Sequence, residues 1–205
     1  MYKMPEDIQM NVLNPKSILK SEWKNIEEGV KTAKHEFHSF IFTTIRENKP
    51  ESRTVILRSF NHKNPSIWFH TDNRSKKVLD IKDNEKICAL FYDRSRKVQL
   101  RINGTSTVEE EKKSNKPIWD AMAPESKICY MGPYAPSETL RKHEPNLLKK
   151  SPHSINKKDD LLGFLRFCRV KIIIEKLEWL QLDYKGHKRL EFNFKEKENI
   201  TWIAS

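Results

Sequence analysis

Residues 68–77 hold the side chains that a phosphate-binding site needs. A strand-like segment runs here into Asp72 and Asn73, two residues that favour the start of a helix. The first turn of such a helix has backbone N–H groups without intrahelical partners, and it attracts anions. A hydroxyl and two ammonium groups occupy that turn, on Ser75, Lys76 and Lys77. The spacing therefore predicts a phosphate site where the strand gives way to the helix.

Residues 52–58 form a β-branched strand with an arginine on each face. Period-two geometry puts Arg53 on one face and Arg58 on the other. The first face also carries Val55 and Leu57, and the second carries Thr54 and Ile56. We therefore expect a core strand that presents cations on both of its sides.

Residues 98–104 alternate in the same way and add an amide. Gln99 and Arg101 share one face, opposite a core-facing row formed by Val98, Leu100 and Ile102. The Gln99 side chain is both donor and acceptor, so it can contact the edge of a heterocycle. Gly104 inside this long strand predicts a β-bulge.

These three segments, in this order, resemble the flavin-binding core of the pyridoxamine 5'-phosphate oxidase family, an antiparallel split β-barrel with flanking helices that binds FMN at a homodimer interface. The resemblance rests on Arg-Thr-Val-Ile-Leu-Arg at 53–58, on His-Thr at 70–71 with Ser-Lys-Lys at 75–77, and on Gln-Leu-Arg at 99–101. It extends from about Phe37 to the C-terminus and weakens after Glu109.

The resemblance implies a set of ligand contacts. Arg53, Thr71, Lys76 and Lys77 would hold the phosphate and ribityl chain of FMN, and Gln99 would contact the isoalloxazine ring. The implied cofactor-binding residues are Arg53, Thr54, Val55, Leu57, Arg58, His70, Thr71, Ser75, Lys76, Lys77, Gln99 and Arg189. The implied substrate contacts are Arg58 and Ser126, and no catalytic residue is assigned.

Two regions depart from the family pattern. Ile118 and Met122 stand where the oxidase has a Tyr and an Arg, so vitamin B6 phosphate is not the expected substrate. His187 to Arg189 resembles the family's C-terminal His/Arg segment, but its register is ambiguous and the chain ends in Trp-Ile-Ala-Ser. Arg189 could equally be an exposed hairpin charge.

The composition indicates one domain over residues 1–205 and an anionic partner. Lys and Arg number 39 against 28 Asp and Glu, which gives a net charge of +11. The glycines form neither a Rossmann nor a P-loop pattern. Three widely spaced cysteines, Cys88, Cys129 and Cys168, indicate buried thiols in a reducing compartment. With no secretory segment or membrane-length apolar run, we expect a cytoplasmic protein.

Hydrophobic periodicity places the remaining elements. A helix is expected at about 15–34, packed on the barrel rather than on a membrane surface, and a Pro-rich insert of loops and short helices at about 117–160. Residues 161–182 are expected to be mostly strand, with a break near Glu175, and seven or eight strands result in all. His35 and His38 have the spacing of a helical metal site but lack a further ligand cluster nearby, so no metal is predicted.

The leading hypothesis is an FMN-dependent oxidoreductase that works as a homodimer and transfers a hydride to or from the flavin. A flavin-binding protein without turnover is the alternative, and haem or deazaflavin could replace FMN on this fold. A basic β-barrel that binds single-stranded nucleic acid is a third hypothesis. It is disfavoured because Phe69, Phe91 and Phe192, which could stack on bases, fall on strand faces that we expect to form the core.

Overall fold

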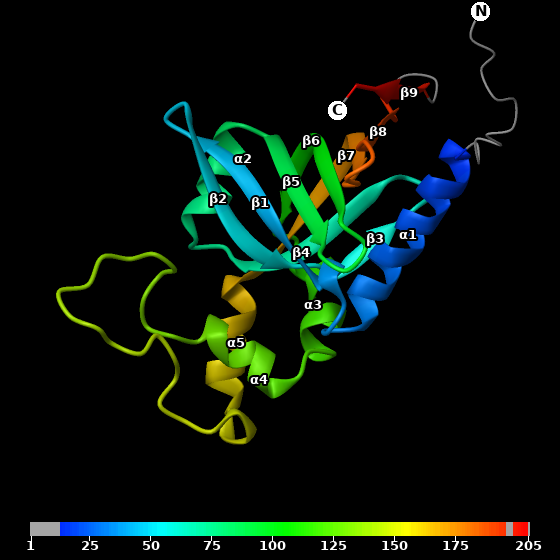
Figure 1. The fold of residues 1–205 in the computed structure, drawn as a ribbon. Coiled ribbons are helices and arrows are strands. Elements are labelled where there is room, and N and C mark those ends of the chain that lie inside the picture. The colour runs from blue at the N-terminus through cyan, green and yellow to red at the C-terminus, as the bar shows by residue number, and fades with distance from the viewer. Residues whose placement is uncertain (1–12, 196–198, 205) are drawn as a thin grey trace, which may run out of the picture.

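Nine antiparallel strands form the body of the molecule in the residues that the computed structural model describes, 13–195 and 199–204 (Figure 1). The strands are β1 (Ser39–Arg46), β2 (Lys49–Ile56), β3 (Ser59–Asn61), β4 (Ser66–Asp72), β5 (Lys86–Asp93), β6 (Val98–Glu109), β7 (Phe167–Gln181), β8 (Lys188–Asn193) and β9 (Asn199–Ile203). The α-helices are α1 (Pro15–Lys31), α2 (Lys76–Asp83), α3 (Lys112–Asp120), α4 (Pro124–Lys127) and α5 (Lys157–Arg166). Short 3-10 turns are η1 (Glu36–His38), η2 (Ile128–Tyr130) and η3 (Pro152–Ser154).

The strand order is that of a split barrel. Along the hydrogen-bonded path it reads β2-β1-β5-β6-β7-β4-β3, and β8 pairs with β7 and with β9. The ladder stays open, because its two ends are β2 and β3. These two strands follow each other in the chain, and the Arg58 N–H between them donates to the Trp68 carbonyl at 2.8 Å. The expected antiparallel split barrel is thereby confirmed, with one strand more than the seven or eight predicted.

A β-bulge interrupts the β6–β7 ladder where the sequence predicts one. Asn103 pairs with Lys176 and Gly104 pairs with Ile174, so Glu175 has no partner across the ladder. Any Cβ on Gly104 would lie 1.9 Å from the Ile173 carbonyl oxygen. Only glycine allows the two backbones to come this close.

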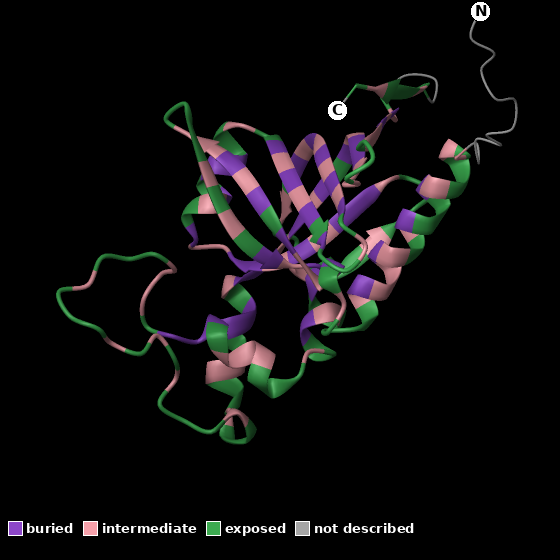
Figure 2. Ribbon diagram, viewed as in Figure 1, coloured by how far each residue is buried: buried purple, intermediate pink, exposed green. Residues whose placement is uncertain are grey.

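The barrel core is built from alternating strand residues (Figure 2). Figure 2 shows buried and less buried positions following each other along β1, β5 and β6, as period-two geometry requires. Phe69, Phe91 and Phe192 are completely buried in this core. This burial confirms the prediction that they belong to the core, where they cannot stack on bases.

Helix α1 packs along the barrel, beside β3 (Figure 1). Asn14 caps it by accepting hydrogen bonds from the backbone of Lys16 and Ser17, at 2.9 and 3.3 Å, and Pro15 occupies its first turn. Ile26 is fully buried against the core. The helix ends at Lys31, three residues before the predicted end. No helix in the described residues has both the length and the apolar character that a membrane crossing requires.

A second hydrophobic cluster lies below the barrel, where α3, α4 and α5 meet (Figure 1). Its buried members are Trp119, Tyr130, Met131, Phe164 and Phe167. The prediction that residues 161–166 belong to a strand is wrong, because they lie in α5. Asn156 caps this helix at the Asp159 N–H, and Gly163 lets the Trp119 ring approach so closely that a Cβ would lie 2.8 Å from it.

Two smaller expectations also need correction. The sequence predicts a hairpin turn over residues 47–50, but Glu47 and Asn48 alone make it, with φ of 49° and 60°, and Pro50 already lies in β2. Pro50 is tolerated there because β2 is an edge strand. Cys129 is exposed rather than buried, whereas Cys168 is buried and Cys88 is half-buried.

Candidate functional site

The phosphate-site candidates meet at the rim of the barrel, where β4 leads into α2. The Lys77 ammonium donates to the Thr71 hydroxyl at 3.2 Å, and this hydroxyl lies 3.1 Å from that of Ser75. Thr71 and Ser75 are buried, so their hydroxyls are held in place by the fold. Burial, and next the nearby charge of Arg53, lower the pKa of Lys77. A cation in this position gains stability from an anion that binds beside it.

The start of α2 keeps free backbone donors, although its cap differs from the predicted one. Ser75, not Asp72 or Asn73, is the N-cap residue, and its side chain makes no capping hydrogen bond to the helix. The Ser75 hydroxyl donates instead to the Asp72 carbonyl at 2.7 Å. The Asp72 carboxylate accepts from the Arg74 backbone and guanidinium. The first turn of α2 thus presents uncapped N–H groups next to Lys77, which fits a phosphate monoester.

Arg53 extends from β2 to the same rim. Its Nη1 atom donates to the Thr44 hydroxyl at 2.7 Å and to the Phe42 carbonyl at 3.3 Å. Lys76, the remaining phosphate candidate, is exposed and lines a shallow groove with Arg46 and Asp83 on the outer side of α2. Arg53, Thr71, Ser75 and Lys77 are therefore together, and Lys76 stands at their edge.

Sequence reasoning missed Asp80, the buried carboxylate of this rim. Only 3% of its side chain is exposed, and it accepts hydrogen bonds from Thr44 at 2.8 Å and from two nitrogens of Arg46 at 2.8 and 2.9 Å. Arg53 Nη2 lies 3.7 Å from it. An acid among the lysines of a short helix resembles an ordinary solvated charge, and its hydrogen-bond partners Thr44 and Arg46 are more than thirty positions away in the chain. Only its place between the buried Val78 and Ile81 hinted at burial.

Arg58 and His70 form a second group near β4, and Ser126 lies apart from β4, in α4. Burial, with the charges of Arg58 and Arg169, lowers the pKa of His70 to about 4, so the imidazole is neutral at pH 7. Arg58 is exposed, and its charge also acts on the Cys129 thiol. That thiol donates to the Ser126 carbonyl at 3.0 Å.

Gln99 and Arg189 lie on strands that flank β7. Both residues pair with Leu180, Gln99 from β6 and Arg189 from β8. Arg189 is half-buried and forms an ion pair with Glu178, so it is not the exposed hairpin charge considered above. Arg101 pairs with the same carboxylate. In the part of the chain that the structure describes, no hydrogen bond or ion pair joins Gln99 or Arg189 to Arg53 or Lys77. In the sheet, β1 and β5 lie between β2, which carries Arg53, and β6, which carries Gln99, so one chain holds these candidates in separate groups.

The other implied contacts are less accessible. Leu57 is fully buried and Val55 nearly so, which leaves mainly their backbone for a ligand, and the Leu57 N–H already donates to the His38 carbonyl at 2.9 Å. Thr54 is exposed. His35 accepts from the Phe37 N–H, and His38 contacts the Gly29 carbonyl. Among the described residues no group of three potential metal ligands occurs.

Comparisons with known proteins agree with this geometry. The family model for the FMN-binding domain of pyridoxamine 5'-phosphate oxidase matches residues 20–110, which include the candidates from Arg53 to Gln99. A pyridoxine/pyridoxamine 5'-phosphate oxidase of Christiangramia forsetii is 27% identical over 113 residues. That match covers 55% of this chain but only 52%, about half, of the relative. The second such oxidase of Arabidopsis thaliana is 27% identical over 83% of this chain and 87% of its own length.

A solved structure shows the same fold over almost the whole chain. It is a pyridoxamine 5'-phosphate oxidase-related, FMN-binding protein of Nostoc punctiforme, with a TM-score of 0.68. The comparison covers 94% of this chain and 99% of the other, at 16% sequence identity. Residues 20–110 thus match the FMN-binding domain of pyridoxamine 5'-phosphate oxidase, and most of the chain is similar in sequence and in fold to split-barrel proteins that carry the name of that oxidase.

Proposed function

We propose that this protein is an FMN-dependent oxidoreductase, a single folded unit that acts as a homodimer in the cytoplasm. Bound FMN would supply hydride transfer, and the chain would bind the cofactor, orient it and shape the substrate pocket. The observation that carries the proposal is Lys77. In the described residues this half-buried ammonium has no carboxylate within ion-pair distance, yet it adjoins two hydroxyls and an uncapped helix start.

Each group of candidates would have its own part in binding. Lys77, Thr71, Ser75 and Arg53 would hold the phosphate, with Lys76 at the entrance. Gln99 would offer its amide to the ring of the flavin. Because the Gln99 and Arg189 group is separate from the phosphate group in one chain, a site shared by two chains would account for their arrangement. Arg58, an exposed cation beside the neutral His70, would attract an anionic substrate.

The phosphate site can be tested with Lys76→Ala combined with Lys77→Ala. FMN and riboflavin differ only in the phosphate, so titration of the apoprotein with both ligands isolates that group. We expect FMN binding to weaken by ~1.5 to 3 kcal/mol for each lost charged contact, and riboflavin binding to change little. The single variants would then separate the half-buried Lys77 from the exposed Lys76.

Lys82→Ala is the matched control, because Lys82 lies in the last turn of the same helix and pairs with Glu110 at 2.8 Å. It should leave both affinities unchanged. If the double variant weakened FMN and riboflavin equally, the lysines would not hold the phosphate and the proposed site would be wrong. The visible spectrum of freshly purified protein, with mass identification of the released cofactor, tests FMN against haem and deazaflavin.

The substrate is expected to differ from that of the named oxidases. Ile118 and Met122 stand where the family has Tyr and Arg, and both pack against the hydrophobic cluster around Trp119. We therefore expect kcat/KM for pyridoxine 5'-phosphate and pyridoxamine 5'-phosphate to be far below that of a true oxidase measured in parallel. Efficient formation of pyridoxal 5'-phosphate would contradict this expectation.

The same two residues favour a second candidate, a flavin-binding protein without turnover. An apolar pair at this position removes two polar groups that could hold a substrate. Anaerobic mixing of the FMN-loaded protein with reduced nicotinamide and with a panel of oxidisable amines would separate the candidates. Bleaching of the flavin absorbance by any of them, at a rate above that of free FMN, would favour the oxidoreductase.

A further inference from the structure

We propose that Asp80 and Thr44 are positioning residues, which orient Arg53 so that its guanidinium can bind the phosphate of FMN. This inference rests on the phosphate site proposed above and extends it to two residues that would not touch the ligand. It starts from one buried hydrogen-bond relay, which runs from Arg53 through Thr44 to Asp80.

The direction of the relay follows from the number of protons available. A threonine hydroxyl has one proton, and the ionised Asp80 carboxylate can only accept. Thr44 therefore donates to Asp80, at 2.8 Å, and its oxygen accepts from Arg53 Nη1, at 2.7 Å. Thr44 is completely buried, so water does not compete for the hydroxyl. The relay thus fixes one end of the guanidinium.

The remaining donors of Arg53 are left for a ligand. Nη1 is used by Thr44 and by the Phe42 carbonyl. Nη2 is 3.7 Å from Asp80, which is beyond hydrogen-bond distance, and Nε makes no hydrogen bond within the described residues. These two nitrogens form the edge of the guanidinium that can grip two oxygens of one phosphate.

The negative charge of Asp80 is neutralised mainly by Arg46. Arg46 binds the carboxylate through two nitrogens, at 2.8 and 2.9 Å, and has a second acid, Glu51, at 3.7 Å. Arg53 and Lys77 therefore remain as cations whose charges are not fully compensated by neighbouring acids. Asp80 can hold the relay in place without cancelling the positive charge that an incoming phosphate meets.

Thr44→Val tests the relay with almost no change in side-chain volume. It keeps every charge and removes only the hydroxyl that accepts from Arg53. We expect the FMN affinity to fall about tenfold, the value of one charge-assisted hydrogen bond, while the riboflavin affinity changes less than about twofold. Thr44→Ser retains the hydroxyl and should restore the ratio of the two affinities. A merely structural role would lower both affinities together.

Asp80→Asn provides a second test, because the two explanations predict opposite changes in FMN affinity. Removal of a negative charge near a phosphate should tighten FMN binding if only Coulomb forces matter. If Asp80 orients Thr44 and Arg53, the variant should instead lower the FMN affinity relative to riboflavin. An unchanged or higher ratio would overturn the proposal, and this variant also decides the matter if Thr44→Val does not fold.

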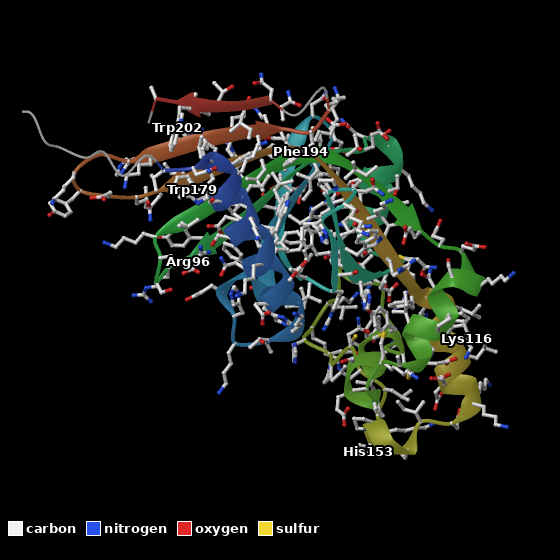
Figure 3. All side chains as sticks on the ribbon, turned by 90° about the vertical axis from the view of Figure 1, so that its right-hand side faces the viewer. Arg96, Lys116, His153, Trp179, Phe194 and Trp202 are labelled. Atoms are coloured by element: carbon white, nitrogen blue, oxygen red, sulfur yellow. The ribbon has the colours of Figure 1, made fainter. Side chains whose placement is uncertain are left out.

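Asp93→Asn is the matched control for loss of a buried carboxylate. Asp93 is 4% exposed and pairs with Arg96, which also binds Glu22 of α1. Figure 3 shows Arg96 and Trp179 near each other beside α1. Both residues are far from Lys116 and His153. This variant should lose stability without changing the ratio of FMN to riboflavin affinity.

Arg53→Ala separates failure of this inference from failure of the phosphate site. If Arg53→Ala leaves the ratio of FMN to riboflavin affinity unchanged, Arg53 does not bind the phosphate and the proposed site itself is wrong. If Arg53→Ala lowers the ratio but Thr44→Val and Asp80→Asn do not, Arg53 binds the phosphate without help from the relay.

Discussion

His70 is a neutral imidazole that is affected by the charges of Arg58 and Arg169, and its ring stands nearly perpendicular to that of Phe167, with centroids 5.0 Å apart. Its pKa of about 4 lies below the ordinary value near 6.5, chiefly because the ring is buried. The unfolded chain therefore takes up a proton as the pH falls below about 6.5, while the folded chain does not until about 4. The folded state loses stability across that window.

Replacement of His70 by Phe should remove this pH dependence. Between pH 6.5 and 5, we expect the free energy of unfolding of the natural protein to fall by up to ~1.4 kcal/mol per pH unit more than that of His70→Phe. Urea unfolding at several pH values measures it. His143→Asn, at an exposed loop position, should behave like the natural protein. Parallel curves for all three proteins would contradict the prediction.

Some residues of the site could be predicted because the sequence keeps them close together. Thr71, Ser75 and Lys77 lie within one strand-to-helix turn, and Arg53 is found by strand alternation. Asp80 could not be predicted in the same way, because its burial depends on Thr44 and Arg46 across the barrel.

At the scale of elements, the β6–β7 bulge leaves no room for a side chain at Gly104. Gly104→Ala would place a methyl group against the Ile173 carbonyl, at a separation that no side-chain rotation can relieve. We expect a loss of ~3 kcal/mol or more in the free energy of unfolding, at the upper end of single substitutions. Denaturant unfolding measures the loss, and Thr107→Ala, at an exposed position of the same strand, is the control. Equal midpoints for both variants would contradict the prediction.

Strands were easier to predict than α5. The sequence predicts a strand at residues 39–46, and β1 has these bounds because the segment is rich in aromatic and β-branched residues, which favour strands. Residues 161–166 contain an apolar run that suits either a strand or a buried helix. The helix forms because Gly163 and Phe164 complete the cluster around Trp119, a partner that is more than forty positions earlier in the chain. Tertiary packing, rather than local preference, decides this element.

At the scale of the whole molecule, the supply of apolar residues does not by itself require a second copy. The sequence has seven apolar strand residues that could exceed the needs of one small barrel and cover a dimer interface. Six of them are buried within the single chain: Val55, Ile67, Phe91, Leu100, Ile172 and Ile174. Only Ile41 is exposed, at 43%. The proposal of a homodimer therefore rests on the family resemblance and on the separation of Gln99 and Arg189 from the phosphate group.

We expect the protein to be a dimer with a mass of twice the 24.4 kDa of the chain. Sedimentation and light scattering at micromolar concentration measure it, and FMN occupancy should fall on dilution as the dimer separates. Interfaces of obligate dimers bury a few thousand Å² in total, so dissociation should need low concentrations. A monomer that keeps stoichiometric FMN would show that one chain forms the whole site.

The extra residue at Glu175 reverses which residues of β7 face the core. Before it, even-numbered residues such as Ile172 and Ile174 face the core, and after it odd-numbered Leu177 and Trp179 do so. The Glu178 carboxylate faces Arg101 and Arg189, away from the barrel interior, only because of this shift. Loss of that single residue would turn the second half of the strand inside out. A relative without the bulge therefore aligns with this chain only if a gap is placed there.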